Sequence, residues 1–373
     1  MARSPRELPP LPSGRVTGTD AFRGFLVLWM LLANSIVWSP RVPRVLEHAP
    51  WGAGVTVTDM VFPWFLFTMG VAIPLSFQAA RRRGTSGWSL AARVVRRGSL
   101  LFLLGLLVYT VVSWRPYFGL GILQMLGLTY VVGAAAMVLS TPLRLVVAAA
   151  LAAGHWSLLV LLPVPGVGPG VLEEERNALR YLNAAYFQPY GLAGLPAVVP
   201  QSAIVLAGTV AGEILARPTW APGKRAAWLV GGGAVVALAG WVVGMDVPPN
   251  RVLWTPSLLL LTAGTGASIL GVLYGLLDAR PVRLVRWVAF PLVVFGSNAI
   301  LLYLGSILFR ELVLRRWSAS WRADGVSLLT ALMQELTARL GPVQAAWVYT
   351  GLVVLLWWCA LYALYRRRVF VRI

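Results

Sequence analysis

Ten stretches of apolar residues recur along the chain, separated by shorter polar segments. A helix needs roughly 20 apolar residues to cross a bilayer, and a continuous run of this kind satisfies its backbone polar groups in lipid as a helix. The pattern therefore predicts an all-α, polytopic membrane helix bundle of about ten transmembrane helices. The expected spans are residues 22–38, 56–77, 99–113, 119–139, 144–162, 197–216, 226–244, 254–277, 288–309 and 344–365.

The composition and the distribution of charge support this interpretation. The chain is 58% hydrophobic and only 12% charged, with a mean hydropathy of +0.74, which leaves too few charges to solvate a soluble protein of this size. The net charge of +19 does not indicate a nucleic-acid partner, because most basic residues fall in alternate inter-helix segments, as the positive-inside rule requires. Both termini are therefore predicted to be cytoplasmic.

The organisation along the chain is expected to be simple. We expect a single transmembrane domain over residues 1–373, with a cytoplasmic tail at 1–20 and an outer loop at 310–343 that carries an amphipathic helix around "SLLTALMQELTARL". The first apolar run is preceded by basic residues but followed by no small-residue cleavage site, so it is predicted to be a retained helix and not a signal peptide.

Polar side chains inside or beside membrane spans are costly and are therefore functional candidates. Most of those found here are expected at the outer level of the membrane, and Asn298 is expected near mid-span. They are Asn34, His48, Asp59, Gln124, Asn250, Arg251 and Asn298.

Each candidate also has a structural explanation. Asp59 follows two threonines in the first turn of a helix, where a carboxylate satisfies free backbone N–H groups. Asn34 and Asn298 can serve as hydrogen-bonded contacts between helices, and His155 suits a hydrogen-bonded interior histidine better than a catalyst. The basic runs at 81–83 and 93–97 are typical of the cytoplasmic membrane surface.

His48 is the strongest candidate for chemistry. An imidazole with an unperturbed pKa of about 6.5 exchanges a proton near neutral pH, as general acid–base catalysis requires. A zinc site is not expected, since two histidines and the single Cys359 do not supply three or four ligands.

Two neighbouring segments together resemble the opening of a known family. The segments "TGTDAFRGFLVLWMLLANS" and "EHAPWGAGVTVTDMVFPWFLFTMGVAIPLS" are similar to the heparan-α-glucosaminide N-acetyltransferase family of transmembrane acyltransferases, which has many bacterial members. Further similar segments follow in the family's order, among them "GILQMLGLTYVV", "PPNRVLWTPSLLLLTAG" and "FGSNAILLYLG". The resemblance covers roughly residues 17–306.

The resemblance implies transfer of an acetyl group from cytosolic acetyl-CoA to an amino sugar on the far side of the membrane, and it suggests a homodimer. His48 maps onto the family's catalytic histidine and Asn34 onto an asparagine near it, while direct attack and a ping-pong route through His48 both stay open. Asp59, Gln124, Asn250, Arg251 and Asn298 are expected to bind substrate. The cations expected to hold the CoA phosphates are Arg23, Arg93, Arg96 and Arg97.

The chain departs from the family pattern at two places. Met125 occupies the position of an arginine that usually follows the family's glutamine, and "QPYG" (188–191) stands where an acidic "DPEG" is common. Both changes remove charge from the outward-facing half, so the acceptor can differ from that of the family.

Other functions remain open from the sequence. The leading hypothesis is an acetyltransferase in a bacterial plasma membrane that acts on an amino sugar, glycan or glycolipid of the cell envelope. It is expected to contact membrane lipids and to need neither metal nor nucleic acid. An O-acyltransferase of an envelope glycan keeps the same mechanism with a hydroxyl acceptor. A transporter without acyl chemistry is a third possibility, because proline and glycine interrupt several spans.

Overall fold

The fold was analysed in a computed structural model, which describes residues 15–36, 39–116, 118–318 and 325–371. The described chain is helical, and seven of its helices are long and apolar enough to cross a membrane; an eighth span results if the pair α10 and α11, bent by 69°, is counted as one. The prediction of a polytopic membrane helix bundle is confirmed. The predicted number of ten spans and the cytoplasmic termini stay predictions.

Helices occur at all ten predicted positions, but three of them differ from the prediction in length, charge or starting residue. α4 is short and apolar, continuing through a 3₁₀ turn to Val138, and α1 carries Asp20 and Arg23 in its first two turns. α3 begins at Gly87, well before the predicted span, so Arg93, Arg96 and Arg97 lie on the helix and not in a loop. The long helices are α1 (Thr17–Ile36), α2 (Val57–Arg82), α3 (Gly87–Ser113), α4 (Ile122–Ala135), α5 (Thr141–Leu161), α7 (Val198–Ala216), α8 (Pro222–Asp246), α9 (Pro256–Tyr274), α10 (Arg283–Ser297), α11 (Ala299–Phe309), α12 (Leu328–Leu340) and α13 (Pro342–Arg366).

The chain divides into two compact units. Among the described residues, those within Met1–Val42, Trp220–Val230 and Ile269–Arg372 form the first unit, and those within Pro43–Thr219 and Gly231–Ser268 form the second.

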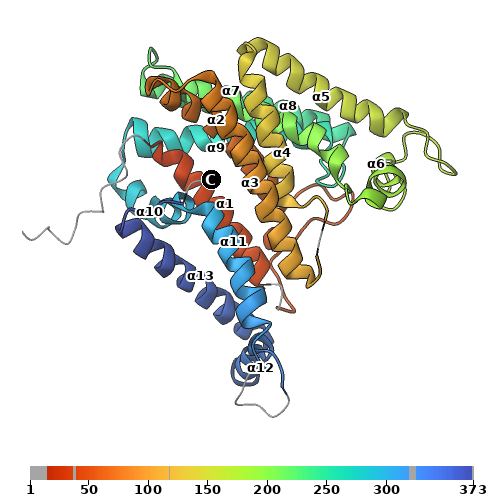
Figure 1. Ribbon diagram of the computed structural model, residues 1–373, viewed down its shortest axis with the longest axis vertical. Helices are drawn as coiled ribbons and strands as arrows, with labels where there is room; N and C mark the ends of the chain where they lie inside the picture. The colour runs from red at the N-terminus through yellow and green to blue at the C-terminus, as the bar shows by residue number, and fades with distance from the viewer. Residues whose placement is uncertain (1–14, 37–38, 117, 319–324, 372–373) are drawn as a thin grey trace, which may run out of the picture. The chain divides into compact units, whose positions relative to one another are not determined.

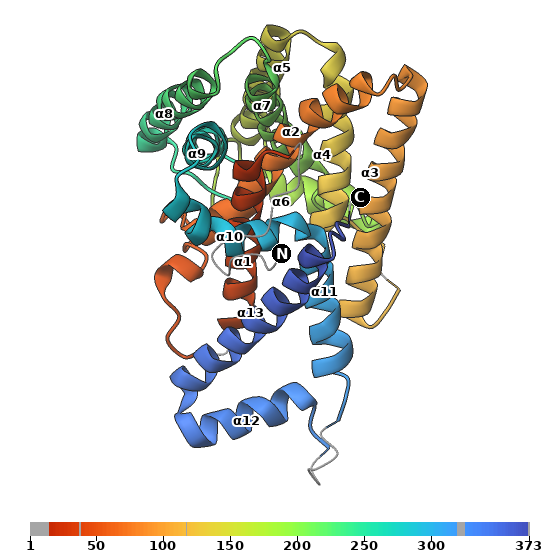
Figure 2. The ribbon, with the colours of Figure 1, turned by 90° about the vertical axis from the view of Figure 1, so that its left-hand side faces the viewer.

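In the first unit, α1 packs against α10, α11 and α13. The amphipathic helix α12 lies where the sequence predicted it and folds back beside α13 (Figure 2). α1 and α10 approach so closely that a Cβ on Gly24 would overlap the Leu292 carbonyl, and a Cβ on Gly296 would overlap the Asp20 carbonyl.

In the second unit, α2 packs most extensively on α7, and α4 contacts α2, α3 and α7 (Figure 1). In lipid, small residues drive such packing because they let helix backbones approach. A Cβ on Gly70 would overlap the Val205 carbonyl oxygen, and one on Gly208 would overlap the Phe67 carbonyl oxygen. This close pair fixes the position of α2, whose first turn carries Asp59.

The α2–α7 contact yields the first prediction. Gly208→Ala is expected to destabilise the protein strongly, because its methyl group must push apart two helix backbones rather than a flexible side chain. Gly154→Ala on α5 is the matched control: nothing lies within 4 Å of its added methyl, and alanine stabilises a helix by up to about 1 kcal/mol over glycine. Thermal unfolding of detergent-solubilised protein measures both, and equal melting temperatures for the two variants would contradict the close contact.

Candidate active site

His48 and Asp59 meet at the first turn of α2. His48 Nδ1 lies 2.7 Å from Asp59 Oδ1; the imidazole side chain is 55% exposed, whereas the carboxylate is 1% exposed. A carboxylate only accepts hydrogen bonds, so Nδ1 carries the proton in this contact. In the neutral ring, the accessible Nε2 is therefore left with its lone pair, available to accept a proton.

The local sequence explains why the carboxylate is held in place. Asp59 stands three residues after Thr56, the N-cap of α2, and its Oδ2 accepts hydrogen bonds from the backbone N–H of Thr56 at 2.9 Å and of Ala49 at 3.0 Å. This is the reciprocal half of a capping box. The capping role that the sequence suggested for Asp59 is therefore present, together with its contact to His48.

The threonines at the start of α2 fasten the His48 loop to the helix. Thr56 Oγ1 donates to the carbonyl of Glu47 at 2.6 Å, and Thr58 Oγ1 donates to the carbonyl of Val45 at 2.9 Å. These bonds flank His48 on its N-terminal side, while the Ala49–Asp59 bond holds its C-terminal side. The imidazole is thus positioned by backbone anchors on both sides.

A guanidinium group reaches the same carboxylate from the loop between α8 and α9. Arg251 Nε lies 2.9 Å from Asp59 Oδ1, with its side chain 42% exposed. Every partner of the carboxylate described here is a donor, so Asp59 acts as an ionised acceptor between an imidazole and a guanidinium.

The turn that presents Arg251 is built by Asn250. Asn250 Oδ1 accepts from the backbone N–H groups of Val252 at 2.8 Å and Leu253 at 3.0 Å. Trp254 then adopts a left-handed conformation with φ 54°, which is uncommon for a bulky residue and needs support from its surroundings. The side-chain oxygen of Asn250 therefore shapes the loop. Contact of Asn250 with substrate stays a prediction.

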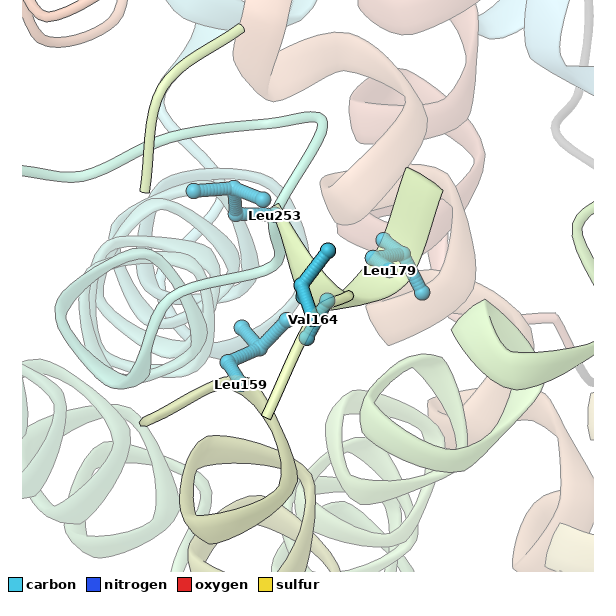
Figure 3. Packing of buried hydrophobic residues seen from close by; sticks show 5 residues of the cluster. Leu159, Val164, Leu179 and Leu253 are labelled. Atoms are coloured by element: carbon cyan, nitrogen blue, oxygen red, sulfur yellow. The ribbon is translucent and has the colours of Figure 1, made fainter. Parts of the chain in front are cut away.

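An apolar cluster and His155 support the loop that carries Arg251 and Trp254. Figure 3 shows Leu253 packed with Leu159, Val164 and Leu179, and Trp51 from the His48 loop packs against the same cluster. Trp51 also donates from Nε1 to the Leu172 carbonyl at 3.1 Å. The loops that carry His48 and Arg251 thus share one hydrophobic base.

His155 anchors this base from α5. It is 4% exposed, and its Nε2 lies 2.8 Å from the carbonyl oxygen of Leu253, two residues after Arg251. A carbonyl only accepts, so Nε2 donates the hydrogen bond. The structure confirms the interior, hydrogen-bonded histidine that the sequence suggested, but only the fold reveals that it holds the Arg251 loop.

A second prediction concerns this anchor. His155→Leu is expected to destabilise the protein by about 1–3 kcal/mol, because it leaves the buried Leu253 carbonyl without its donor, and to raise amide hydrogen exchange at residues 250–255. His155→Gln retains a side-chain donor and serves as the control. Unchanged exchange in the leucine variant would show that the loop does not depend on His155.

Gln124 lies deep in the second unit. Its side chain is fully buried, and its Nε2 donates to the Gly119 carbonyl at 3.1 Å, while its Oε1 has no hydrogen-bond partner among the described residues. Met125 beside it contacts Gln201, whose Nε2 lies 3.4 Å from the methionine sulfur. Gln201 is 1% exposed. The sequence analysis did not name it as a candidate, although a glutamine within the apolar run of α7 could have indicated a buried polar site.

The α3 arginines expected to bind phosphate differ in their surroundings. Arg93 Nε donates to the carbonyl of Ser89 on its own helix at 3.3 Å, and Arg96 is exposed. The guanidinium of Arg97 lies 4.6 Å from the centre of the Tyr130 ring. Their contact with CoA stays a prediction.

The remaining predicted residues belong to the first unit. Asn34 is exposed in the last turn of α1, and its backbone carbonyl lies 3.5 Å from Arg310 Nη1. Asn34 helps to line a cavity of about 30 Å³ together with Ser306, Arg310 and Tyr349, which is room for roughly one water molecule. The structure therefore brings together His48, Asp59 and Arg251, and it places Asn34 in a separate unit.

Asn298 and Arg23 have different surroundings within that unit. Asn298 is 1% exposed at the bend between α10 and α11; its Nδ2 donates to the carbonyl of Val369 at 3.1 Å, and its Oδ1 accepts from the N–H of Val371 at 2.7 Å. Arg23 lies 3.9 Å from Asp20 on the next turn of α1. The amide of Asn298 thus pairs with the C-terminal segment. Substrate binding by Asn298 and contact of Arg23 with the CoA phosphates both stay predictions.

Comparison with known proteins points to one group of enzymes. A domain of unknown function, DUF5009, matches residues 15–132, a range that includes His48 and Asp59. The chain is 26% identical to the heparan-alpha-glucosaminide N-acetyltransferase of Homo sapiens over 98% of its own length, and 25% identical to that of Mus musculus over 97%. It spans about 60% of the length of these relatives. The multi-pass chain is accordingly a distant relative of the heparan-alpha-glucosaminide N-acetyltransferases, as the order of its sequence motifs predicted.

Proposed function

We propose that the protein is a transmembrane acetyltransferase that moves an acetyl group from cytosolic acetyl-CoA to an amino sugar or glycan on the outer side of the membrane. The observation that carries the proposal is the His48–Asp59 contact, in which an accessible imidazole is held by a buried carboxylate. The names of the two relatives add the reaction class, since both are N-acetyltransferases.

The geometry supports proton transfer at Nε2 of His48. In direct transfer, the acceptor nitrogen bonds to the acetyl carbonyl carbon while its proton passes to Nε2; the C–S bond then breaks, and the CoA thiolate leaves and takes that proton. In the two-step alternative, Nε2 itself attacks the carbonyl carbon and the C–S bond breaks, which releases the CoA thiolate. The acceptor nitrogen then attacks the acetyl carbon, the bond from this carbon to Nε2 breaks, and the proton of the acceptor passes to the freed Nε2. Asp59 serves both routes, because it orients the ring and stabilises the imidazolium.

Arg251 has a positioning role in this proposal. It contacts the same oxygen of Asp59 as His48 does, and its positive charge balances the negative charge of that carboxylate when the imidazole is neutral. The resemblance maps Asn34 onto an asparagine near the family's catalytic histidine, and on that ground alone its amide is proposed to donate to the developing oxyanion. The acetyl donor, the glucosamine-type acceptor, a homodimer and a bacterial plasma membrane are all parts of the proposal.

The test uses purified protein in liposomes with [14C]acetyl-CoA and a panel of glucosamine-containing acceptors. We expect label on an acceptor, and label retained on the protein itself would select the two-step route. A labelled amide survives mild base that removes an ester, which separates N- from O-acetylation. Substrate flux across the liposome without any loss of thioester would instead point to a transporter and overturn the proposal.

A further inference from the structure

In the first unit, several buried hydrogen-bond donors have no partner among the described residues. They are Nη1 of Arg15, Oγ1 of Thr19, Nε of Arg286, Nε1 of Trp358 and the hydroxyl of Tyr365. Trp358 lies about two helical turns before Tyr365 on α13, and we refer to the other four residues as the donor cluster. Buried polar groups are nearly always hydrogen-bonded. Four such donors at the ends of packed helices therefore indicate that a group supplying acceptor oxygens belongs there.

Three helix ends bring the cluster together. Arg15 precedes α1 and Thr19 lies in its first turn, Arg286 lies in the first turn of α10, and Tyr365 lies in the last turn of α13. α1, α10 and α13 pack against one another. The topology predicted from the basic residues places all three of these helix ends at the cytoplasmic side.

Aromatic contacts connect the members more closely. The Arg15 guanidinium lies 4.8 Å from the centre of the Phe370 ring, and that ring lies 5.9 Å from the Tyr365 ring. Tyr365 also packs edge-on against Phe290 at 5.7 Å, one helical turn from Arg286 on α10. The charged groups near enough to act on the Tyr365 hydroxyl are Asp20, Arg15 and Arg286.

The nearby carboxylates are already engaged. Asp20 lies 3.5 Å from Arg15 Nε and 3.9 Å from Arg23 Nη1. Asp278 accepts the backbone N–H groups of Thr17 and Gly18, both at 2.8 Å, and so caps α1. Three guanidinium groups against two carboxylates leave one positive charge uncompensated among these five side chains.

We propose that the donor cluster is a binding site for a phosphate group. Two guanidinium groups and two hydroxyls, arriving from three helices, suit an anion with several acceptor oxygens, and arginine pairs well with phosphate geometry. If the ligand is CoA, the inference rests on the proposed function and locates one phosphate of the donor substrate. A phospholipid headgroup offers the same chemistry at the same side of the membrane.

The C-terminal segment covers this site. Phe370 lies against Arg15 and Tyr365, and the residues on either side of it, Val369 and Val371, are held by the amide of Asn298. Movement of this segment is the step that would open the donors to a ligand. Asn298 then acts on the site indirectly, by holding its cover.

The test compares Arg286→Gln and Tyr365→Phe with Arg283→Gln, an exposed arginine on the same helix. CoA binding is measured with the full-length protein in phospholipid-free detergent, with pantetheine, which lacks the phosphates, as the reference ligand. We expect CoA affinity to fall by about tenfold or more in Arg286→Gln, to fall less in Tyr365→Phe, and to stay within about twofold in Arg283→Gln. Pantetheine affinity should not change.

A second arm identifies the source of the phosphate. Short-chain phosphatidic acid is added to the same micelles, and thermal stabilisation is recorded. Stabilisation that Arg286→Gln abolishes, with CoA affinity unaffected, would assign the site to a lipid headgroup. If neither ligand depends on Arg286 or Tyr365, the phosphate site is wrong and the donors are satisfied by buried water.

Acetyl transfer measured in parallel separates this inference from the proposed function. Phosphate-dependent CoA binding through Arg286 without any acetyl transfer would leave the site standing and remove the proposed function. Acetyl transfer in both cluster variants with an unchanged KM for acetyl-CoA and unchanged stabilisation by phosphatidic acid would remove the phosphate site and leave the proposed function standing.

Discussion

His48→Ala is expected to lower the rate of acetyl transfer by about 10²–10⁴-fold, the usual contribution of a general acid–base group. If His48 carries the acetyl group itself, transfer should fall to background and label on the protein should vanish. The imidazole is largely exposed and reaches Asp59 through a single ring nitrogen, so its removal should change the fold little. Initial rates with [14C]acetyl-CoA in liposomes measure the effect.

The control for this variant is the neighbouring exposed Glu47. Its backbone carbonyl accepts from Thr56, so Glu47→Gln alters only a surface charge, and its rate should stay within about twofold of wild type. A His48→Ala protein that elutes normally and retains acetyl transfer within about threefold would show that the chemistry resides elsewhere.

Asp59→Asn is expected to lower both activity and stability. The amide can turn its NH₂ group toward His48 or Arg251, where the carboxylate offered an oxygen. The ring then loses its fixed orientation, and its proton can move from Nδ1 to Nε2, so that Nε2 can no longer accept one. We expect a fall in kcat of about 10²-fold or more and a loss of about 1–3 kcal/mol of stability from the weakened cap and the unpaired guanidinium. Kinetics and thermal unfolding of the same preparation measure the two effects.

Asp246→Asn is the matched control, since Asp246 is exposed at the end of α8. It should change neither quantity. If Asp59→Asn unfolds at a lower temperature but keeps its kcat, the carboxylate is only a helix cap, which is the structural role that the sequence already suggested for this position.

Much of the architecture was predictable because hydrophobic run length is a local property. An apolar stretch of about 20 residues has few alternatives to a membrane helix, and for that reason helices occur at each predicted position. Where prediction and structure differ, a local property was again the cause. The sequence boundary of the third span followed hydropathy, whereas α3 starts earlier at Gly87, after Ser86, whose side chain caps the helix by accepting from the backbone N–H of Ser89.

The candidate site was only partly predictable, and residue chemistry sets that limit. A histidine beside the start of a helix, in a motif shared with a known family, was enough to single out His48. Asp59 was expected to cap α2 or to bind substrate, but its contact with His48 requires the loop before α2 to fold back over the helix start. The spacing of residues along the sequence does not predict that the loop folds back in this way.

The most distant partnerships depend on tertiary packing. Arg251 reaches Asp59 because α5, through His155, and the apolar cluster around Leu253 hold the intervening loop. Asn298 pairs with the chain near its C-terminal end, and Asp278 caps α1 from more than 250 positions away. The amino-acid sequence was sufficient for the helices, the candidate reacting group and the distant relationship, since these depend on local composition and motif order. The side-chain partners that orient His48, and the donor cluster at the helix ends, arise only when helices remote in the chain pack together.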